Sequence, residues 1–229
     1  MFYTIKAPWL FKKIIYPSLI WEKPTEEKIL YLTFDDGPHP AATPFVLDQL
    51  KQYNAKATFF CIGKNVMQEQ NLYRRILDEG HKAGNHTFDH LNGWKTNNEI
   101  YITNISKAAK YIDSNLFRPP YGRITKLQAS MLQRVSGEGL MDDEKKDNKQ
   151  SSSFTTLHSP FTIVMWTILS GDFDEKISPE RCLQNVILHS KPGNIIVFHD
   201  SRKAWNRMSF ALPRVLEYFS KQDFRFKTL

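Results

Sequence analysis

The feature that most constrains the fold of this chain is a regular alternation of short apolar segments with longer amphipathic ones. The apolar segments predict strands at residues 29–34, 56–62, 81–86, 117–118, 161–167, 194–198 and 224–227. The amphipathic segments predict a helix capped by Thr43 and further helices at 65–79, 97–113, 125–135, 179–189 and 205–220. Alternating strands and helices build an α/β fold with a parallel sheet, either open or closed into a barrel. About seven strands fit a barrel somewhat short of eight.

The predicted organisation is one domain, residues 29–229, preceded by an extension, residues 1–28. A chain of 229 residues is long enough to bury the core of one such domain. Residues 136–159 interrupt the alternation, because they are charged, Ser-rich and poor in apolar side chains. We interpret them as an insertion loop, with a lid over the substrate as the alternative.

The first 28 residues are basic, aromatic and apolar, yet they do not form a clear export signal. Lys12 and Lys13 interrupt the apolar run, and no small-residue cleavage site follows. No stretch reaches the roughly 18 apolar residues of a transmembrane helix. We expect the extension to pack against the domain, with contact to a membrane surface as the alternative. Either arrangement of the extension favours a cytoplasmic or membrane-peripheral location of the protein.

Charge and cysteine content exclude two function classes. The formal net charge is +7, but lysines and arginines are scattered and form no basic arm, so we expect no nucleic-acid partner. Cys61 and Cys182 belong to no C-x-x-C pair, which excludes a zinc knuckle or a dithiol redox motif.

Two adjacent carboxylates follow the first predicted strand, in the segment TFDDGP. Asp35 and Asp36 repel one another unless a cation or a shared proton separates their roles. Gly37 and Pro38 turn the chain sharply and hold both carboxylates at the carboxyl end of the strand. The same residues also suit a simple turn, so the pair alone does not establish a site.

The segment HTFDH follows the third predicted strand and supplies two histidines. His86 and His90 are four residues apart, so on a helical turn they face the same side and can share a metal ion. Together with Asp36 they make two imidazoles and one carboxylate. Such a set leaves a coordination position open for water or substrate, as catalytic zinc sites require.

Three further segments place polar side chains at predicted strand ends. Arg118 and Tyr121 lie in RPPYG, Asp172 follows the fifth strand, and His199 follows the very apolar strand at 194–198. The carboxyl ends of parallel strands form the catalytic face of α/β barrels, so we expect these side chains to meet.

These segments, in this order, resemble the polysaccharide deacetylase family, also called the NodB homology domain or carbohydrate esterase family four. The resemblance covers residues from about Ile29 to Phe226, and TFDDGP, HTFDH and RPPYG are its most specific elements. It implies a distorted (β/α) barrel with about seven parallel strands. It also implies hydrolysis that depends on a divalent metal, with zinc expected first and cobalt or nickel as alternatives.

The resemblance also implies a role for each matching residue. The implied catalytic roles are a general base (Asp35), three metal ligands (Asp36, His86, His90), an arginine that orients the base (Arg118), a backbone N–H for the oxyanion (Tyr121), a general acid (His199) and an aspartate that tunes it (Asp172). The implied substrate-binding residues are Tyr121, Phe173 and Val197, of which Phe173 and Val197 line a pocket for the acetyl methyl group. These roles are chemically complete, because amide hydrolysis needs an activated water, a stabilised oxyanion and a proton for the leaving nitrogen.

The chain departs from the family pattern at three positions. Leu169 stands where an aspartate is usual, Phe173 replaces a tryptophan, and Val197 replaces a leucine. None of these changes removes a predicted ligand, base or acid. We therefore expect an active enzyme with an altered acyl pocket.

The function expected from the sequence is removal of N-acetyl groups from an amino-sugar polysaccharide or glycoconjugate. Two alternatives stay open. The same groups suit an O-acetyl ester or an N-formyl group on a sugar. A degenerate site would instead leave a non-catalytic carbohydrate-binding protein.

Overall fold

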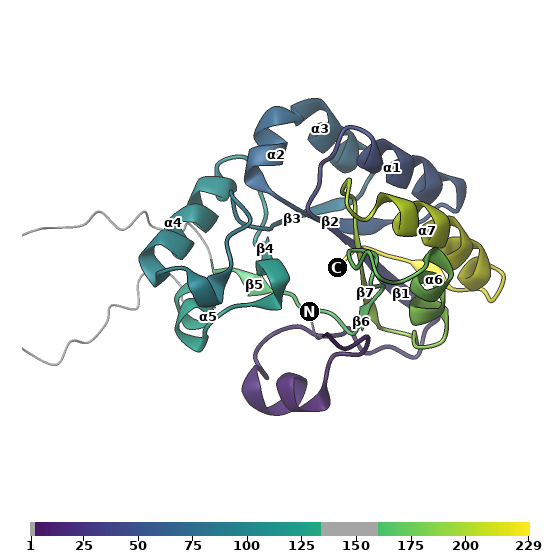
Figure 1. Cartoon of the computed structure of the whole chain (residues 1–229), viewed down its shortest axis with the longest axis horizontal. Coiled ribbons are helices and arrows are strands. Elements are labelled where there is room, and N and C mark those ends of the chain that lie inside the picture. Colours follow the sequence, from purple (N-terminus) through teal and green to yellow (C-terminus); the bar gives the residue numbers. More distant parts are fainter. Residues whose placement is uncertain (1–2, 134–159) are drawn as a thin grey trace, which may run out of the picture.

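A computed structural model describes residues 3–133 and 160–229, so the predicted insertion at 136–159 lies outside the described residues. All strand pairs of the sheet are parallel, and its order is β5-β4-β3-β2-β1-β7-β6, with β8 also paired to β1. The strands are β1 (Ile29–Asp35), β2 (Ala57–Cys61), β3 (Lys82–Asn85), β4 (Leu116–Phe117), β5 (Thr162–Ile163), β6 (Ile168–Leu169), β7 (Ile195–His199) and β8 (Arg225–Phe226). The sheet curls into a partial barrel (Figure 1), which confirms the predicted fold class.

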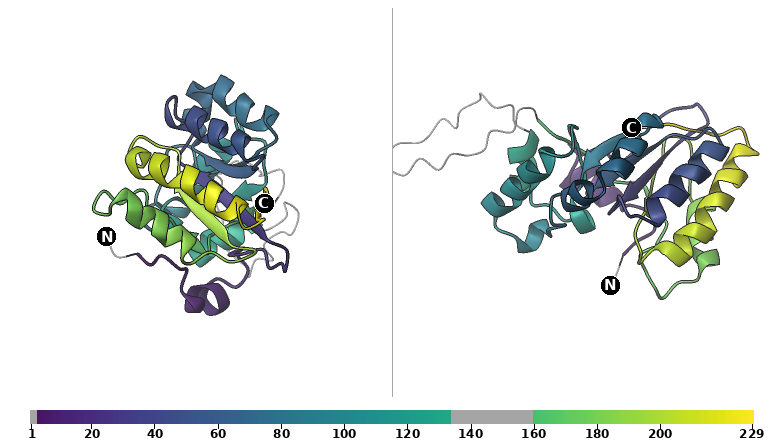
Figure 2. Two further views of the ribbon diagram at one scale, coloured as in Figure 1. Left: turned by 90° about the vertical axis from the view of Figure 1, so that its right-hand side faces the viewer. Right: turned by 90° about the horizontal axis from the view of Figure 1, so that it is seen from above.

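Helices cover the outside of the curled sheet (Figure 1). They are α1 (Ala42–Gln52), α2 (Gly63–Gln68), α3 (Gln70–Asp78), α4 (Asn98–Ala109), α5 (Lys126–Gln133), α6 (Pro179–Ile187) and α7 (Trp205–Ser220). α7 packs against both α1 and α6, and the three helices lie across one outer face in the left view of Figure 2. Within residues 3–133 and 160–229, no helix combines the length and apolarity that a membrane crossing requires.

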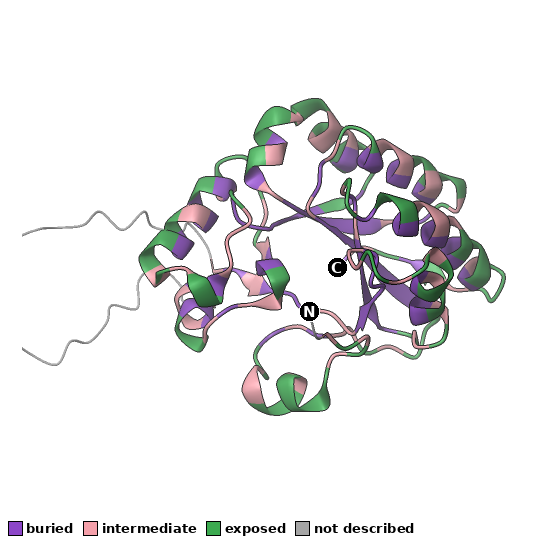
Figure 3. Cartoon of the chain, viewed as in Figure 1, coloured by how far each residue is buried: buried purple, intermediate pink, exposed green. Residues whose placement is uncertain are grey.

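The two faces of β1 have different surroundings because side chains alternate along a strand. Leu32 and Phe34 point outward and join the main core beneath the helices. Thr33 and Asp35 point inward and pair in register with Val197 and His199 of β7. Burial on both faces explains why β1 reads as a continuous apolar run (Figure 3). The inner face therefore carries polar groups to the carboxyl end of the sheet.

The predicted strand at 161–167 is too long, because only Thr162–Ile163 within it forms a strand of the sheet. β5 ends at Ile163 and β6 begins at Ile168. Between them, the carbonyl groups of Val164 and Met165 accept hydrogen bonds from the side chain of Arg118. Part of this segment's hydrogen bonding thus goes to a side chain and not to a neighbouring strand.

Two helix predictions also need correction. The predicted helix at 65–79 is two helices, α2 and α3, separated at Glu69, which has non-helical dihedral angles (φ −115°, ψ 48°). Thr43 is not the N-cap of α1, because that helix starts at Ala42. His39 Nδ1 instead accepts the N–H groups of Ala41 and Ala42, both at 3.2 Å.

The extension lies across the gap between the two edge strands (Figure 1). The Ile20 N–H donates to the Ile163 carbonyl at 3.0 Å, and the Met165 N–H donates back to the Ile20 carbonyl at 2.7 Å. Lys6 pairs antiparallel with Ile168 on the other side of the gap. The described part of the extension thus packs on the domain, while the division at residue 28 stays a prediction.

Candidate active site

The predicted site residues converge at the carboxyl end of the sheet. Parallel pairing of β1 with β7 sets Asp35 directly beside His199. The segments that follow β3, β4 and β6 supply the remaining candidates, because those strands end at the same edge. The alternation of strands and helices therefore brings together groups that are up to 164 residues apart in the chain.

Three side chains form a cluster that can hold a metal ion. One ligand atom each from Asp36, His86 and His90 lies within 4.8 Å of the others. Oδ1 of Asp36 is 3.2 Å from Nε2 of His90 and 3.8 Å from Nε2 of His86. Within the described part of the chain, this buried oxygen accepts no hydrogen bond. Because a buried carboxylate oxygen without a partner is costly, the cluster fits a bound divalent cation.

The two histidines do not lie on a helical turn, so that prediction is wrong. Thr87 and His90 have left-handed dihedral angles, with φ of 62° and 57°. Asn104 from α4 accepts the N–H groups of Phe88 and Asp89 with its side-chain oxygen, at 2.8 and 3.0 Å. These bonds fix an irregular loop that brings the imidazole ring of His90 to 5.1 Å from that of His86, centre to centre.

The segment RPPYG orients both imidazoles. Nδ1 of His86 lies 2.7 Å from the carbonyl oxygen of Arg118, so it carries the proton and leaves Nε2 free to bind a metal. Burial lowers the pKa of His86 to about 4, which keeps the ring neutral. Nδ1 of His90 lies 3.1 Å from the hydroxyl of Tyr121. Sequence analysis predicted that Tyr121 binds the oxyanion and the substrate, and it missed this contact of the hydroxyl with His90.

Tyr121 has a left-handed backbone (φ 60°, ψ 7°) in a short 3₁₀ turn, Pro120–Gly122. The residue is 51% exposed, so its hydroxyl contacts His90 while the rest of the residue stays accessible to solvent. The following Gly122 is also left-handed, and a methyl group there would collide with Trp166. The turn thus depends on glycine at this position.

Asp35 is held by a fully buried arginine. Nη1 of Arg118 donates to Oδ1 of Asp35 at 2.8 Å and to the hydroxyl of Thr33 at 2.7 Å. Its other nitrogens bond the carbonyl groups of Val164 and Met165, and the guanidinium lies 4.1 Å from the centre of the Phe60 ring. Arg118 therefore supplies a fixed counter-charge that leaves the second oxygen of Asp35 available.

His199 is tied to Asp172 by two hydrogen bonds. Nδ1 of His199 lies 2.7 Å from Oδ1 of Asp172, and the His199 N–H donates to Oδ2 at 2.6 Å. Burial acts to lower the pKa of His199, but the carboxylates of Asp172, Asp36 and Asp35 outweigh it and raise the pKa to about 10. The imidazole therefore carries a proton at neutral pH, as a general acid requires.

Two buried ionisable side chains near the site were missed by sequence analysis. Arg207 of α7 donates from Nε to the carbonyl of Asp172 at 2.7 Å. Asp200 accepts the N–H of Gly37 at 3.1 Å and the hydroxyl of Thr43, and burial raises its pKa to about 8. Neither residue belongs to a recognisable pattern, so only the fold reveals that they support the site.

The predicted acyl-pocket residues lie around His199. The ring of Phe173 meets that of His199 edge-on, with centres 5.3 Å apart. Val197 is buried two residues earlier on β7, in register with Thr33 and Leu169. Their assignment to an acyl pocket stays a prediction.

Comparison with known proteins links this site to one family. Residues 22–136 match the family model described as polysaccharide deacetylase. A peptidoglycan-N-acetylglucosamine deacetylase of Bacillus cereus is 34% identical over 227 residues, which cover 96% of each protein. A chitooligosaccharide deacetylase of Azorhizobium caulinodans is 32% identical over 178 residues, covering 75% of this chain and 73% of that protein.

The fold is also similar to that of solved deacetylases. One structure is a peptidoglycan N-acetylglucosamine deacetylase in complex with 4-naphthalen-1-yl-N-oxidanyl-benzamide. It superposes with a TM-score of 0.75 at 29% identity, covering 96% of this chain and 95% of the other. The likeness therefore extends beyond the short motifs to nearly the whole chain.

Proposed function

Because this chain belongs to the polysaccharide deacetylase family, we propose that it removes N-acetyl groups from an amino-sugar polymer in a metal-dependent hydrolysis. The observation that carries the proposal is the convergence of the Asp36, His86 and His90 cluster with Asp35 and His199 at one edge of the sheet. This arrangement brings the cation site, the base and the acid of an amide hydrolase into one place.

Asp36, His86 and His90 are the proposed metal ligands. A divalent cation held there would polarise the amide carbonyl and acidify water. Two imidazoles and one carboxylate suit zinc first, and cobalt or nickel fit the same donors.

Asp35 and His199 divide the proton transfers between them. Asp35, held by Arg118, accepts the proton of the attacking water. His199 gives its proton to the leaving amine nitrogen as the C–N bond breaks, and Asp172 keeps that proton on the ring. The two aspartates of TFDDGP thus have separate tasks, since Asp36 binds the cation and Asp35 takes the proton.

The remaining predicted residues would bind the acyl group. The backbone N–H of Tyr121 is proposed to stabilise the oxyanion that forms on the carbonyl carbon. Phe173 and Val197 are proposed to enclose the acetyl methyl group, with Phe173 against the acid His199.

The proposed substrate class is a polymer that contains N-acetylglucosamine, because the curated relatives are named as deacetylases of peptidoglycan N-acetylglucosamine and of chitooligosaccharides. An O-acetyl ester or an N-formyl sugar stays the alternative. A panel of matched amide and ester substrates separates these, since the preferred class releases its acid fastest.

The test uses the metal-stripped protein with N-acetylglucosamine oligomers. Zinc or cobalt should restore acetate release, and Asp35→Asn or His199→Ala should abolish it while the protein stays folded by circular dichroism. Full activity in both variants would overturn the assigned roles. Failure to bind zinc at saturating concentration would favour a non-catalytic carbohydrate-binding protein.

The extension supports contact with a membrane surface as a second, separate part of the proposal. Trp9, Leu10 and Ile14 are exposed at 66%, 49% and 57%, and Lys13 is exposed beside them. Exposed aromatic and aliphatic groups with a lysine suit the interface of an anionic bilayer, and this supports the proposal of a membrane-peripheral location. Co-sedimentation with phosphatidylglycerol vesicles should fall in Trp9→Ala, and unchanged binding would argue against this contact.

A further inference from the structure

The described residues at the start of the chain pair with the edge of the sheet through an isolated β-bridge. Residues 3–7 run beside β6, where Lys6 pairs antiparallel with Ile168 and the Leu169 N–H donates to the Ile5 carbonyl at 2.9 Å. β6 is consequently held from both sides, by β7 and by this segment. The loop that follows β6 carries Asp172 and so depends on that anchoring.

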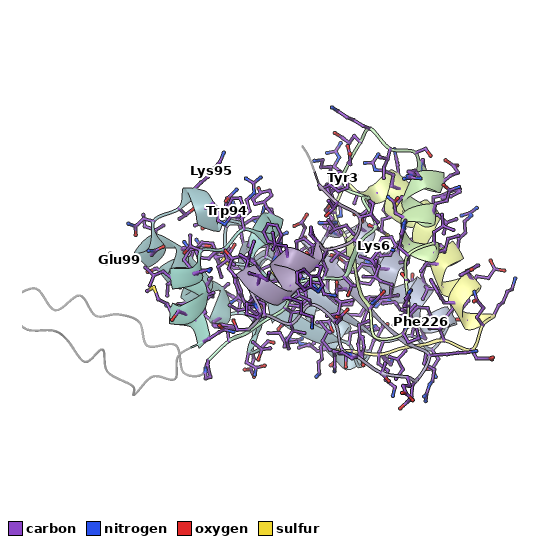
Figure 4. All side chains as sticks on the ribbon, turned by 90° about the horizontal axis from the view of Figure 1, so that it is seen from below. Tyr3, Lys6, Trp94, Lys95, Glu99 and Phe226 are labelled. Carbon is purple, nitrogen blue, oxygen red and sulfur yellow. The ribbon has the colours of Figure 1, made fainter. Side chains whose placement is uncertain are left out.

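Tyr3 extends from this segment to the loop after β6. Its hydroxyl donates to Oδ2 of Asp174 at 3.0 Å, and its ring packs on Phe173 with centres 5.0 Å apart. Burial and the bond to Asp174 raise the pKa of Tyr3 to about 12, so the hydroxyl keeps its proton. In Figure 4, Tyr3 lies toward the same edge of the molecule as Trp94, and Lys6 lies between Tyr3 and Phe226.

The contacts continue from Tyr3 to the catalytic acid. Phe173 packs on Tyr3, and its ring also meets the ring of His199 edge-on. The neighbouring Asp172 holds Nδ1 of the same imidazole. Aromatic pairs in tilted or edge-to-face geometry attract one another beyond the effect of the area they bury.

We propose that Tyr3 is a positioning residue of the active site, which braces Phe173 against His199 and so fixes the wall of the acyl site and the ring of the acid. This inference rests on the proposed function, because His199 acts as an acid only there. Loss of the Tyr3 ring leaves Phe173 free to turn into the space that the ring occupied. The acid is then less well placed, and the acyl site admits a longer acyl group.

The experiment compares Tyr3→Ala with Tyr3→Phe and with Lys6→Ala in the zinc-loaded full chain. For N-acetylglucosamine oligomers we expect kcat of Tyr3→Ala to fall about tenfold with little change in KM, since small misplacements of catalytic groups cost this much or more. The ratio of kcat/KM for N-acetyl over N-propionyl substrate should fall as well. Tyr3→Phe keeps the ring and should retain most activity, and Lys6→Ala, an exposed side chain of the same segment, should match the wild type.

A second measurement does not depend on activity. The His199 amide, which donates to Asp172, should exchange its hydrogen faster in Tyr3→Ala than in Lys6→Ala. If Tyr3→Ala keeps the wild-type kcat, acyl preference and exchange rate, the inference is wrong, even if the melting temperature falls. If Tyr3→Ala does not fold, Tyr3→Leu replaces it, because it also removes the ring that packs on Phe173, and wild-type kinetics in Tyr3→Leu overturns the inference.

The two proposals fail in different ways. If the wild type releases no acetate from these oligomers, the proposed function fails. The hydrogen exchange rate of the His199 amide then tests by itself whether Tyr3 braces Phe173 against His199. Equal rates in Tyr3→Ala and Lys6→Ala would refute that role.

Discussion

Arg118→Met should destabilise the protein severely, because it leaves the carboxylate of Asp35 buried without its counter-charge. Arg118 is fully buried, and its guanidinium donates to Asp35, to Thr33 and to two main-chain carbonyl groups. Removing one member of a buried ion pair typically costs about 3–5 kcal/mol. For a chain of this size each kcal/mol lowers Tm by roughly 2–4 °C, so Tm should fall by roughly 12 °C. The assay is thermal unfolding of metal-free protein, where no cation can take over the charge balance.

The double variant Asp35→Leu/Arg118→Met tests the cause. Replacing both partners removes the unpaired charge, so the pair should be more stable than Arg118→Met alone, with a coupling energy of about 2 kcal/mol. Stability does not return fully, because the carbonyl groups of Val164 and Met165 still lack their donor. Neither variant should release acetate. A Tm of Arg118→Met within about 2 °C of wild type, or additive effects of the two changes, would refute the electrostatic reasoning.

The remaining predictions concern pH, metal affinity and a tight turn. The pKa of His199 is raised from 6.5 to about 10, so the stability that its protonation contributes is complete below pH 6.5 and is lost as the pH rises to 10. Urea unfolding of metal-free protein should show this loss of stability in the wild type and no such loss in Asp172→Asn. Tyr121→Phe loses the hydroxyl that contacts His90, a proposed metal ligand, and should weaken zinc binding about tenfold in chelator competition. Equal zinc affinity would show that the hydroxyl does not orient the His90 ring. Gly37→Ala places a methyl group against the buried Asp200 and should lower Tm markedly, which differential scanning calorimetry measures; an unchanged Tm would contradict that packing.

The parts of the fold and site that the sequence predicted have strong local signals. Continuous apolar runs such as Ile29–Asp35 mark buried parallel strands, and the turn residues after them mark the strand ends where catalytic groups collect. Asp36, His86 and His90 were chosen as candidate ligands because carboxylate and imidazole groups bind divalent metals, and the structure brings the three together. The parallel sheet brings Asp36 and His86 to the same edge, because each directly follows a strand, whereas His90 lies further along the loop after β3.

The parts that the sequence did not predict depend on contacts between distant segments. His90 reaches the cluster through a left-handed loop that Asn104 stabilises, and no local pattern encodes that contact. The hydroxyl of Tyr121 and the guanidinium of Arg207 act on residues 31 and 35 positions away. The segment between β5 and β6 has strand-like composition, yet its carbonyl groups bond a buried arginine. Contacts of this kind can be identified only in the folded structure, which shows which distant residues are neighbours.

X-ray absorption at the zinc edge, on protein loaded with one equivalent of zinc, tests the central claim most directly. The proposed site predicts two imidazole nitrogens at about 2.0–2.1 Å with oxygen donors completing the shell. It predicts that His90→Ala loses one imidazole and that Asp35→Asn keeps both. A shell without imidazole, or a spectrum unchanged in His90→Ala, would contradict a metal centre built on Asp36, His86 and His90.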